Sequence, residues 1–289
     1  MIRRLSALLA ALSLALAGGS AQAKPPVWVA HDADSTITFF GSIHVLPANL
    51  DWRPPELNEA LAHADDIWFE TPMDSMSLAT TSHAAYEKGL LPKGHRLHDL
   101  LSPIGQERLD RLVAKYGLWP DDIDAMEPWL ADVTLSVTPL GRQGAAGSAG
   151  VEQTLEEETP KSVTRRAFET GPQQIDFFHR APLSEQAGLL EQTLEELDTD
   201  PGAYNALLEA WMGADIPGLL AEGDARLQAA SPVLYKRLVT DRNERWTRIL
   251  MRRLAGHGST VVVVGAGHLV GPNGVPARLR ALGVQVDGP

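Results

Sequence analysis

Two histidines lie in the same short pattern, Gly-x-x-His, and each pattern follows an apolar run typical of a β-strand. His44 follows Gly41-Ser42-Ile43, and His268 follows Gly265-Ala266-Gly267. A glycine at a strand end lets the backbone turn sharply or lets a ligand come close. An isolated histidine is more often bonded to a neighbouring loop, but the duplication favours a shared site.

Two glutamates occupy the same kind of position. Glu70 ends the apolar run Ile67-Trp68-Phe69, and Glu169 follows Ala167-Phe168. A buried carboxylate needs a cation or a metal as partner, although either residue could instead cap a helix or form a salt bridge. Glu152 fits a ligand role and equally a first-turn glutamate favoured by a helix dipole.

Side chains that leave neighbouring strands at their carboxyl ends can converge in one crevice. Two imidazoles with carboxylates can bind Zn, Mn, Co or Fe, and an open coordination position activates water for hydrolysis. We therefore expect His44, His268 and Glu70 to hold a divalent metal, Mn, Co or Zn. Glu70, Glu169 and Arg242 are the candidate catalytic residues, with Glu70 as a metal ligand or the general base and Arg242 holding an oxyanion.

Other patterns in the sequence give weaker indications of a functional site. Gly265-x-Gly267 with Gly271 resembles a dinucleotide loop, but the last glycine is one position late and too little chain follows. His95 and His98 lie in a loop flanked by proline and glycine, where a surface position is expected. The tryptophans of the helical parts, Trp119, Trp129, Trp211 and Trp246, are expected to pack in the core.

The elements that must position these residues follow from periodicity. Residues 27–31 and 36–40 predict a hairpin, 55–64 a helix and 67–70 a strand. Helical patterns dominate from about 75 to 140 and again from 183 to 254, and the unbroken apolar run 261–264 indicates a strand covered on both faces. We predict an α/β fold with α+β character, in which helices surround a central mixed β-sheet and a large helical insertion spans about 75–140.

The segment 141–150 contains four glycines, a composition that predicts a mobile loop, either a lid or a connector. Residues 24–289 are expected to form one domain around this insertion and loop. The chain has no cysteine, so disulfides and thiolate ligands are excluded. The sequence shows no internal repeat at a solenoid period.

Residues 1–23 have the form of a secretory signal peptide. Arg3 and Arg4 precede the apolar run 5–17, and small residues end at Ala23, after which we expect cleavage. The run is shorter than the roughly 18 to 20 residues of a spanning helix, and no later segment is long enough. We therefore expect a periplasmic or secreted protein, exported by the general secretory route rather than the twin-arginine route.

Removing the two arginines of the signal takes the net charge from -12 to about -14. Nucleic acid is therefore not expected as a partner, because binding it draws mainly on clustered Lys and Arg. The residues leave the oligomeric state open.

The order of these motifs resembles the TraB/PrgY/GumN family. The resemblance covers nearly the whole mature chain through the following ordered segments: Gly41-Ser42-Ile43-His44-Val45-Leu46-Pro47, Ile67-Trp68-Phe69-Glu70, Gly150-Val151-Glu152, Phe168-Glu169-Thr170, Asp241-Arg242-Asn243 and Val264-Gly265-Ala266-Gly267-His268-Leu269-Val270-Gly271. It implies a fold related to the erythromycin-esterase and ChaN-like proteins, and to the Tiki proteins, which are described as metal-dependent proteases. It also implies metal or catalytic roles for His44, Glu70 and His268, supported by Glu169 and Arg242, and an association with exopolysaccharide gene clusters.

Three functions remain open at this level. The first is a metal-dependent hydrolase, more peptidase than esterase. The second is a non-catalytic binding protein of the cell envelope that captures a peptide or glycan. The third is a glycosidase that uses Glu70 and Glu169 as its pair of carboxylates, which requires a suitable separation between them.

Overall fold

The computed structural model describes residues 24–289, so the predicted signal peptide and its cleavage site lie outside the described residues. The strands are β1 (Val27–His31), β2 (Ser35–Ser42), β3 (Leu46–Pro47), β4 (Asp66–Phe69), β5 (Ala145–Ala146), β6 (Thr164–Ala167), β7 (Gly258–Gly265) and β8 (Gln285–Asp287). Six of them form one mixed sheet in the order β6-β4-β7-β2-β1-β8, and β3 pairs with β5. The predicted fold class is confirmed.

The predicted helical tracts are helical in the structure as well. The α-helices are α1 (Pro55–Ala62), α2 (Ser75–Lys88), α3 (Pro103–Lys115), α4 (Pro120–Asp124), α5 (Pro128–Arg142), α6 (Val151–Glu158), α7 (Gly171–His179), α8 (Leu183–Thr199), α9 (Ala203–Met212), α10 (Ile216–Leu219), α11 (Arg226–Ala230), α12 (Pro232–Tyr235), α13 (Asp241–Leu254) and α14 (Val275–Ala281). Two π-helical turns (Leu220–Ala225, Lys236–Thr240) and three 3-10 turns (Leu97–Leu100, Gly147–Ala149, Ala266–His268) complete the set. Prolines begin many of these helices because their fixed φ suits the first turn.

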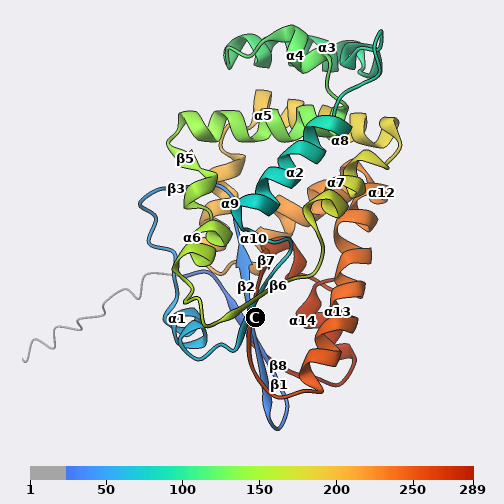
Figure 1. Ribbon diagram of the computed structural model, residues 1–289. Helices are drawn as coiled ribbons and strands as arrows, with labels where there is room; N and C mark the ends of the chain where they lie inside the picture. The colour runs from blue at the N-terminus through green and yellow to red at the C-terminus, as the bar shows by residue number, and fades with distance from the viewer. Residues whose placement is uncertain (1–23) are drawn as a thin grey trace, which may run out of the picture.

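The molecule has a sheet part and a helical part. Figure 1 shows α1 on one side of the sheet and α13 and α14 on the other, with the layer of α5 and α8 beyond one end of it. The main core lies around the sheet and contains Phe39, Trp211 and Trp246, all fully buried. A second apolar cluster joins α3, α5 and α8. No helix within residues 24–289 has the length and apolar character to cross a membrane.

Two sequence expectations need correction. Trp119 was expected in the core, but 77% of its surface is exposed, because it precedes the short polar helix α4 at the periphery. The segment 141–150 is not a loop without structure. Helix α5 continues to Arg142, β5 pairs with β3, and a 3-10 turn leads to Gly150. The pairing with β3 supplies the backbone hydrogen bonds that composition alone could not predict.

Candidate functional site at the carboxyl edge of the sheet

Four parallel strands end at the same edge of the sheet. In the register, Ser42 of β2 lies opposite Gly265 of β7, and Phe69 of β4 lies opposite both Val263 of β7 and Ala167 of β6. The residues that follow each strand are therefore neighbours in space. The structure places the four sequence-predicted residues His44, Glu70, Glu169 and His268 along this edge, each just after one of these strands.

His44 forms a pair with Glu152, the glutamate in the first turn of α6. The distance from His44 Nδ1 to Glu152 Oε1 is 2.7 Å, and the hydroxyl of Ser42 donates to the same oxygen at 2.5 Å. The Glu152 side chain is buried, whereas that of His44 is 66% exposed. The imidazole is thus fixed through one nitrogen, and its Nε2 is turned to an accessible space.

The glycines before α6 allow this arrangement. A Cβ at Gly150 would lie 2.1 Å from the backbone oxygen of His44, so no larger residue fits without moving the backbone. The amide of Val151 also donates to the oxygen of Ile43. The Gly-rich segment therefore lies directly against the loop that carries His44.

Arg242, on α13, connects the other three residues. Its Nε donates to Glu169 at 2.7 Å, and one terminal nitrogen donates to Glu70 at 2.5 Å and also to Glu169. The other terminal nitrogen donates to the backbone oxygen of Leu238 and to His268 Nε2, both at 2.9 Å. All five N–H groups of the buried guanidinium are thereby used.

His268 is held as a neutral imidazole. Its Nδ1 lies 2.6 Å from Asn243 Oδ1, an oxygen that can only accept, so Nδ1 carries the proton and Nε2 accepts from Arg242. Burial, together with the neighbouring Arg242, lowers the pKa of His268 to about 3. The ring also packs on Trp246, with a centroid separation of 4.4 Å.

Glu70 is an ionised acceptor surrounded by donors. It accepts from the backbone N–H of Gly265 at 2.7 Å, from Gln174 Nε2 at 2.8 Å and from Arg242. Burial alone would raise the pKa of Glu70, but Arg242 and the Gly265 amide hold that pKa well below its usual range. A carboxylate so stabilised is a weak base.

The electrostatics of His44 differ from those of His268. Glu152 raises the pKa of His44 to about 9, opposed by partial desolvation. Because two-thirds of the side chain is exposed, water screens part of this attraction. The edge of the sheet therefore holds one histidine that is readily protonated and one that stays neutral.

His44, Glu70 and Glu152 line a pocket of about 380 Å³, whose lining also includes the apolar side chains of Phe69, Met73 and Leu78. The carboxylate of Glu70 and the Nε2 of His44 face a common point. A Cβ added at Gly265 would lie 3.2 Å from Glu70 Oε1 and 3.9 Å from His44 Nε2. The pocket thus combines a polar wall with an apolar one.

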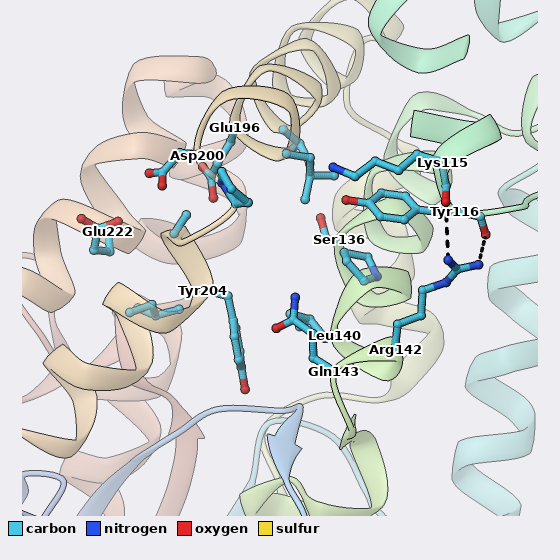
Figure 2. Close-up of a pocket in the computed structure, with 16 residues that line it drawn as sticks. Lys115, Tyr116, Ser136, Leu140, Arg142, Gln143, Glu196, Asp200, Tyr204 and Glu222 are labelled. Atoms are coloured by element: carbon cyan, nitrogen blue, oxygen red, sulfur yellow. Dashed lines mark hydrogen bonds between the residues drawn. The ribbon is translucent and has the colours of Figure 1, made fainter. Parts of the chain in front are cut away.

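A separate cavity of about 500 Å³ lies between α5, α8 and α9 (Figure 2). It contains none of the predicted site residues. Its wall residue Tyr204 donates a hydrogen bond of 2.8 Å to the backbone oxygen of Val45, next to His44. Helix α9 therefore helps to hold the loop that follows β2.

The metal prediction requires a shared ion between His44, His268 and Glu70. Within residues 24–289, no three His, Cys, Asp or Glu side chains are arranged to share one ion. The reason is chemical: the Nε2 lone pair of His268 and one oxygen of Glu70 already bind Arg242. The donor set in this arrangement does not fit a divalent metal unless Arg242 moves, and the metal site stays a prediction.

Several residues of the cluster were not among the sequence candidates. Asn243 orients His268, Gln174 binds Glu70, and Arg245 donates to Glu169 at 2.5 Å. The three-residue spacing of Arg242 and Arg245 on one helix was the available signal, since such residues share a face. Thr170, not Glu169, caps α7.

The histidines of the loop before α3 lie away from the site. Both ring nitrogens of His98 bind carboxylates, those of Asp124 and Asp110, each at 2.9 Å. His95 is exposed in the same loop. Their expected surface position agrees with the structure, and they take no part in the cluster at the sheet edge.

Comparison with known proteins agrees with the order of motifs along the chain. A sequence model of the TraB/PrgY/gumN family matches residues 26–288. The uncharacterized protein YbaP of Escherichia coli K12 is 25% identical over 242 residues, which cover 83% of this chain and 86% of YbaP, and YbaP of Shigella flexneri matches to the same extent. No solved structure matches. Since the family match covers almost the entire chain and includes every residue of the site, this chain belongs to the TraB/PrgY/gumN family.

Proposed function

We propose that the chain is a hydrolase in which His44 activates a water molecule as general base. The observation that carries the proposal is the His44–Glu152 pair: a buried carboxylate holds Nδ1 at 2.7 Å while Nε2 faces the pocket. In this geometry Nε2 takes the proton from water, and Glu152 stabilises the imidazolium that forms. Such a base contributes roughly 10²- to 10⁴-fold to the rate.

The other residues have positioning roles under this proposal. Arg242 has no N–H left for an oxyanion, because its five donors are engaged, so it holds Glu70, Glu169 and His268 in place. Gln174 lines the same pocket and uses one amide N–H on Glu70, which leaves the other for a substrate oxygen. Glu70 places a negative charge beside the reacting water and does not act as a base, because its pKa is held well below the usual range.

The apolar wall favours a substrate with an apolar group beside the bond that is cleaved. Phe69, Met73 and Leu78 line the pocket together with its polar residues. A peptide with an apolar side chain meets this requirement, and we place peptides before esters as substrates. A periplasmic or secreted location and a link to exopolysaccharide belong to the same proposal as expectations.

The glycosidase alternative has weaker support. Glu70 and Glu169 both bind the same terminal nitrogen of Arg242. Burial raises the pKa of Glu169, as the acid of a glycosidase would require. The glycosidic bond must, however, lie between the two carboxyl groups, and the guanidinium of Arg242 occupies that position.

The test is a cleavage assay of the purified protein on a mixed library of unstructured peptides, read by mass spectrometry, with p-nitrophenyl butyrate as the ester probe. The critical variants are His44→Asn and Glu152→Gln, and the matched control is His63→Asn, an exposed histidine at the end of α1. We expect His44→Asn to lose at least about 100-fold in rate and the control to keep its rate.

The proposed general base predicts the direction in which the rate changes with pH. The hydrolysis rate should rise as pH rises through the pKa of His44, because only the neutral imidazole can accept a proton. Glu152 raises this pKa from 6.5 to about 9. Glu152→Gln should move this limb toward neutral pH, because it removes the charge that raises the pKa.

Chelation and reloading with Mn, Co and Zn separate the alternatives. Turnover that survives chelation supports the general-base proposal. Turnover that disappears on chelation and returns with one metal would overturn it in favour of a metal-dependent hydrolase. Saturable peptide binding without cleavage under any condition would instead support the envelope binding protein.

A further inference from the structure

A third cavity, of about 550 Å³, opens between α7, the π-helical turn Lys236–Thr240 and α13. Three arginines line it, Arg180, Arg237 and Arg245, together with the aromatic rings of Phe168 and Phe177. It shares no lining residue with the pocket that holds His44. Its character is therefore cationic and aromatic, in a chain whose net charge is -12.

The charges around this cavity do not cancel. Asp176 is the one carboxylate in its lining, and it is paired with Lys88 at 2.6 Å and with Arg180 at 2.8 Å. Arg245 is paired with Glu169. For Arg237, no carboxylate oxygen lies within ion-pair distance in the part of the chain that the structure describes. The cavity thus carries one guanidinium without a counter-charge.

The position of Arg237 in the fold makes its lack of a counter-charge unusual. It is half-buried and lies in a π-helical turn, a conformation that is rare and occurs often at functional sites. An anion in the cavity would supply the counter-charge that this guanidinium lacks among the described residues. A cavity in which one sign of charge predominates also concentrates ligands of the opposite sign.

We propose that this cavity binds a carboxylate or phosphate group attached to an apolar body. Guanidinium groups match the geometry of both oxyanions and form charge-assisted hydrogen bonds with them. The rings of Phe168 and Phe177 would contact the apolar part of the ligand. The proposal does not rest on hydrolysis, although Arg245 and Glu169 connect the cavity to Arg242 and so to the candidate site.

The test is isothermal titration calorimetry on the purified protein with three probes of one shape: benzoate, phenyl phosphate and benzyl alcohol. We expect saturable binding of at least one of the anions and none of the alcohol. A preference for phenyl phosphate or for benzoate assigns the oxyanion that the cavity takes. Absence of saturable binding by both anions, or equal binding of benzyl alcohol, would overturn the proposal.

Two variants locate the site. Arg237→Gln should weaken anion binding about tenfold or more, because it removes a charge-assisted hydrogen bond. Arg180→Gln, whose side chain is 70% exposed, should weaken it as well and places little demand on folding. The control is Arg248→Gln, on α13 but paired with Glu244 outside the cavity. If both cavity variants bind the anion with the affinity of the wild type, or if the control loses as much affinity as they do, the assignment is contradicted.

Discussion

Replacement of Arg242 by methionine should strongly destabilise the protein, whatever its substrate. The side chain is 4% exposed and binds Glu70 and Glu169, which are 7% and 6% exposed. Methionine has a similar length but no charge, so two buried carboxylates would lose their shared cation. Breaking a buried ion pair from one side costs about 3 to 5 kcal/mol, because the remaining charge is left without compensation.

The assay is reversible unfolding by urea together with thermal unfolding at neutral pH. For a chain of this size, 1 kcal/mol corresponds to about 2 to 4 °C, so the midpoint should fall by roughly 6 to 20 °C. The matched control is Arg248→Met on the same helix, whose exposed pair with Glu244 is worth less than about 1 kcal/mol.

Two further observations would test the physical cause. In a background of Glu70→Gln and Glu169→Gln, Arg242→Met should cost much less, since no buried charge is then left unpaired. Acid should also bring the wild type and Arg242→Met together. The lowered pKa of Glu70 means that its contribution is present above about 4.5 and is lost as pH falls through the pKa in the folded protein. A loss below 1 kcal/mol, or the same loss in the double-glutamine background, would refute the reasoning.

Three other predictions follow from single contacts. The imidazole of His268 should stay neutral down to about pH 3 in a ¹⁵N NMR titration. Its contribution to stability should be lost as pH falls from about 6.5 toward 3, because the unfolded chain takes up the proton first. A titration of His268 near pH 6.5 would contradict this. Gly150→Ala should lower the unfolding free energy by about 1 to 3 kcal/mol through its clash with a backbone oxygen, whereas Gly141→Ala, which meets nothing within 4 Å inside α5, should not; equal unfolding midpoints would be the contrary result. If the apolar wall binds substrate, Leu78→Lys should raise KM for peptides with apolar side chains while Met76→Lys, 75% exposed on the same helix, leaves it unchanged; equal KM values in the two variants would exclude that role.

Arg242 also explains why the site contains two histidines with opposite behaviour. The guanidinium beside His268 opposes a second positive charge, and burial acts in the same direction. His44 lies beside Glu152 and close to solvent, so its positive form is favoured. The two copies of Gly-x-x-His are therefore alike in sequence position but differ in protonation.

The sequence by itself determined the elements and the edge at which the site lies. Alternating and unbroken apolar runs predicted the hairpin of β1 and β2 and the buried strand β7, because burial imposes those periods. The rule that parallel strands end at one edge then brought His44, Glu70, Glu169 and His268 together. The family resemblance followed from the order of the same motifs.

Only the tertiary structure decided which residue pairs with which. Helix α13 approaches from more than 70 positions away in sequence and inserts Arg242 between two glutamates, and α6 presents Glu152 to His44. Composition made segment 141–150 resemble a loop, yet β3 lay near enough to pair with part of it. Local patterns state what a residue can bind, but the partner depends on distances across the chain, which are fixed only when the helices pack on the sheet.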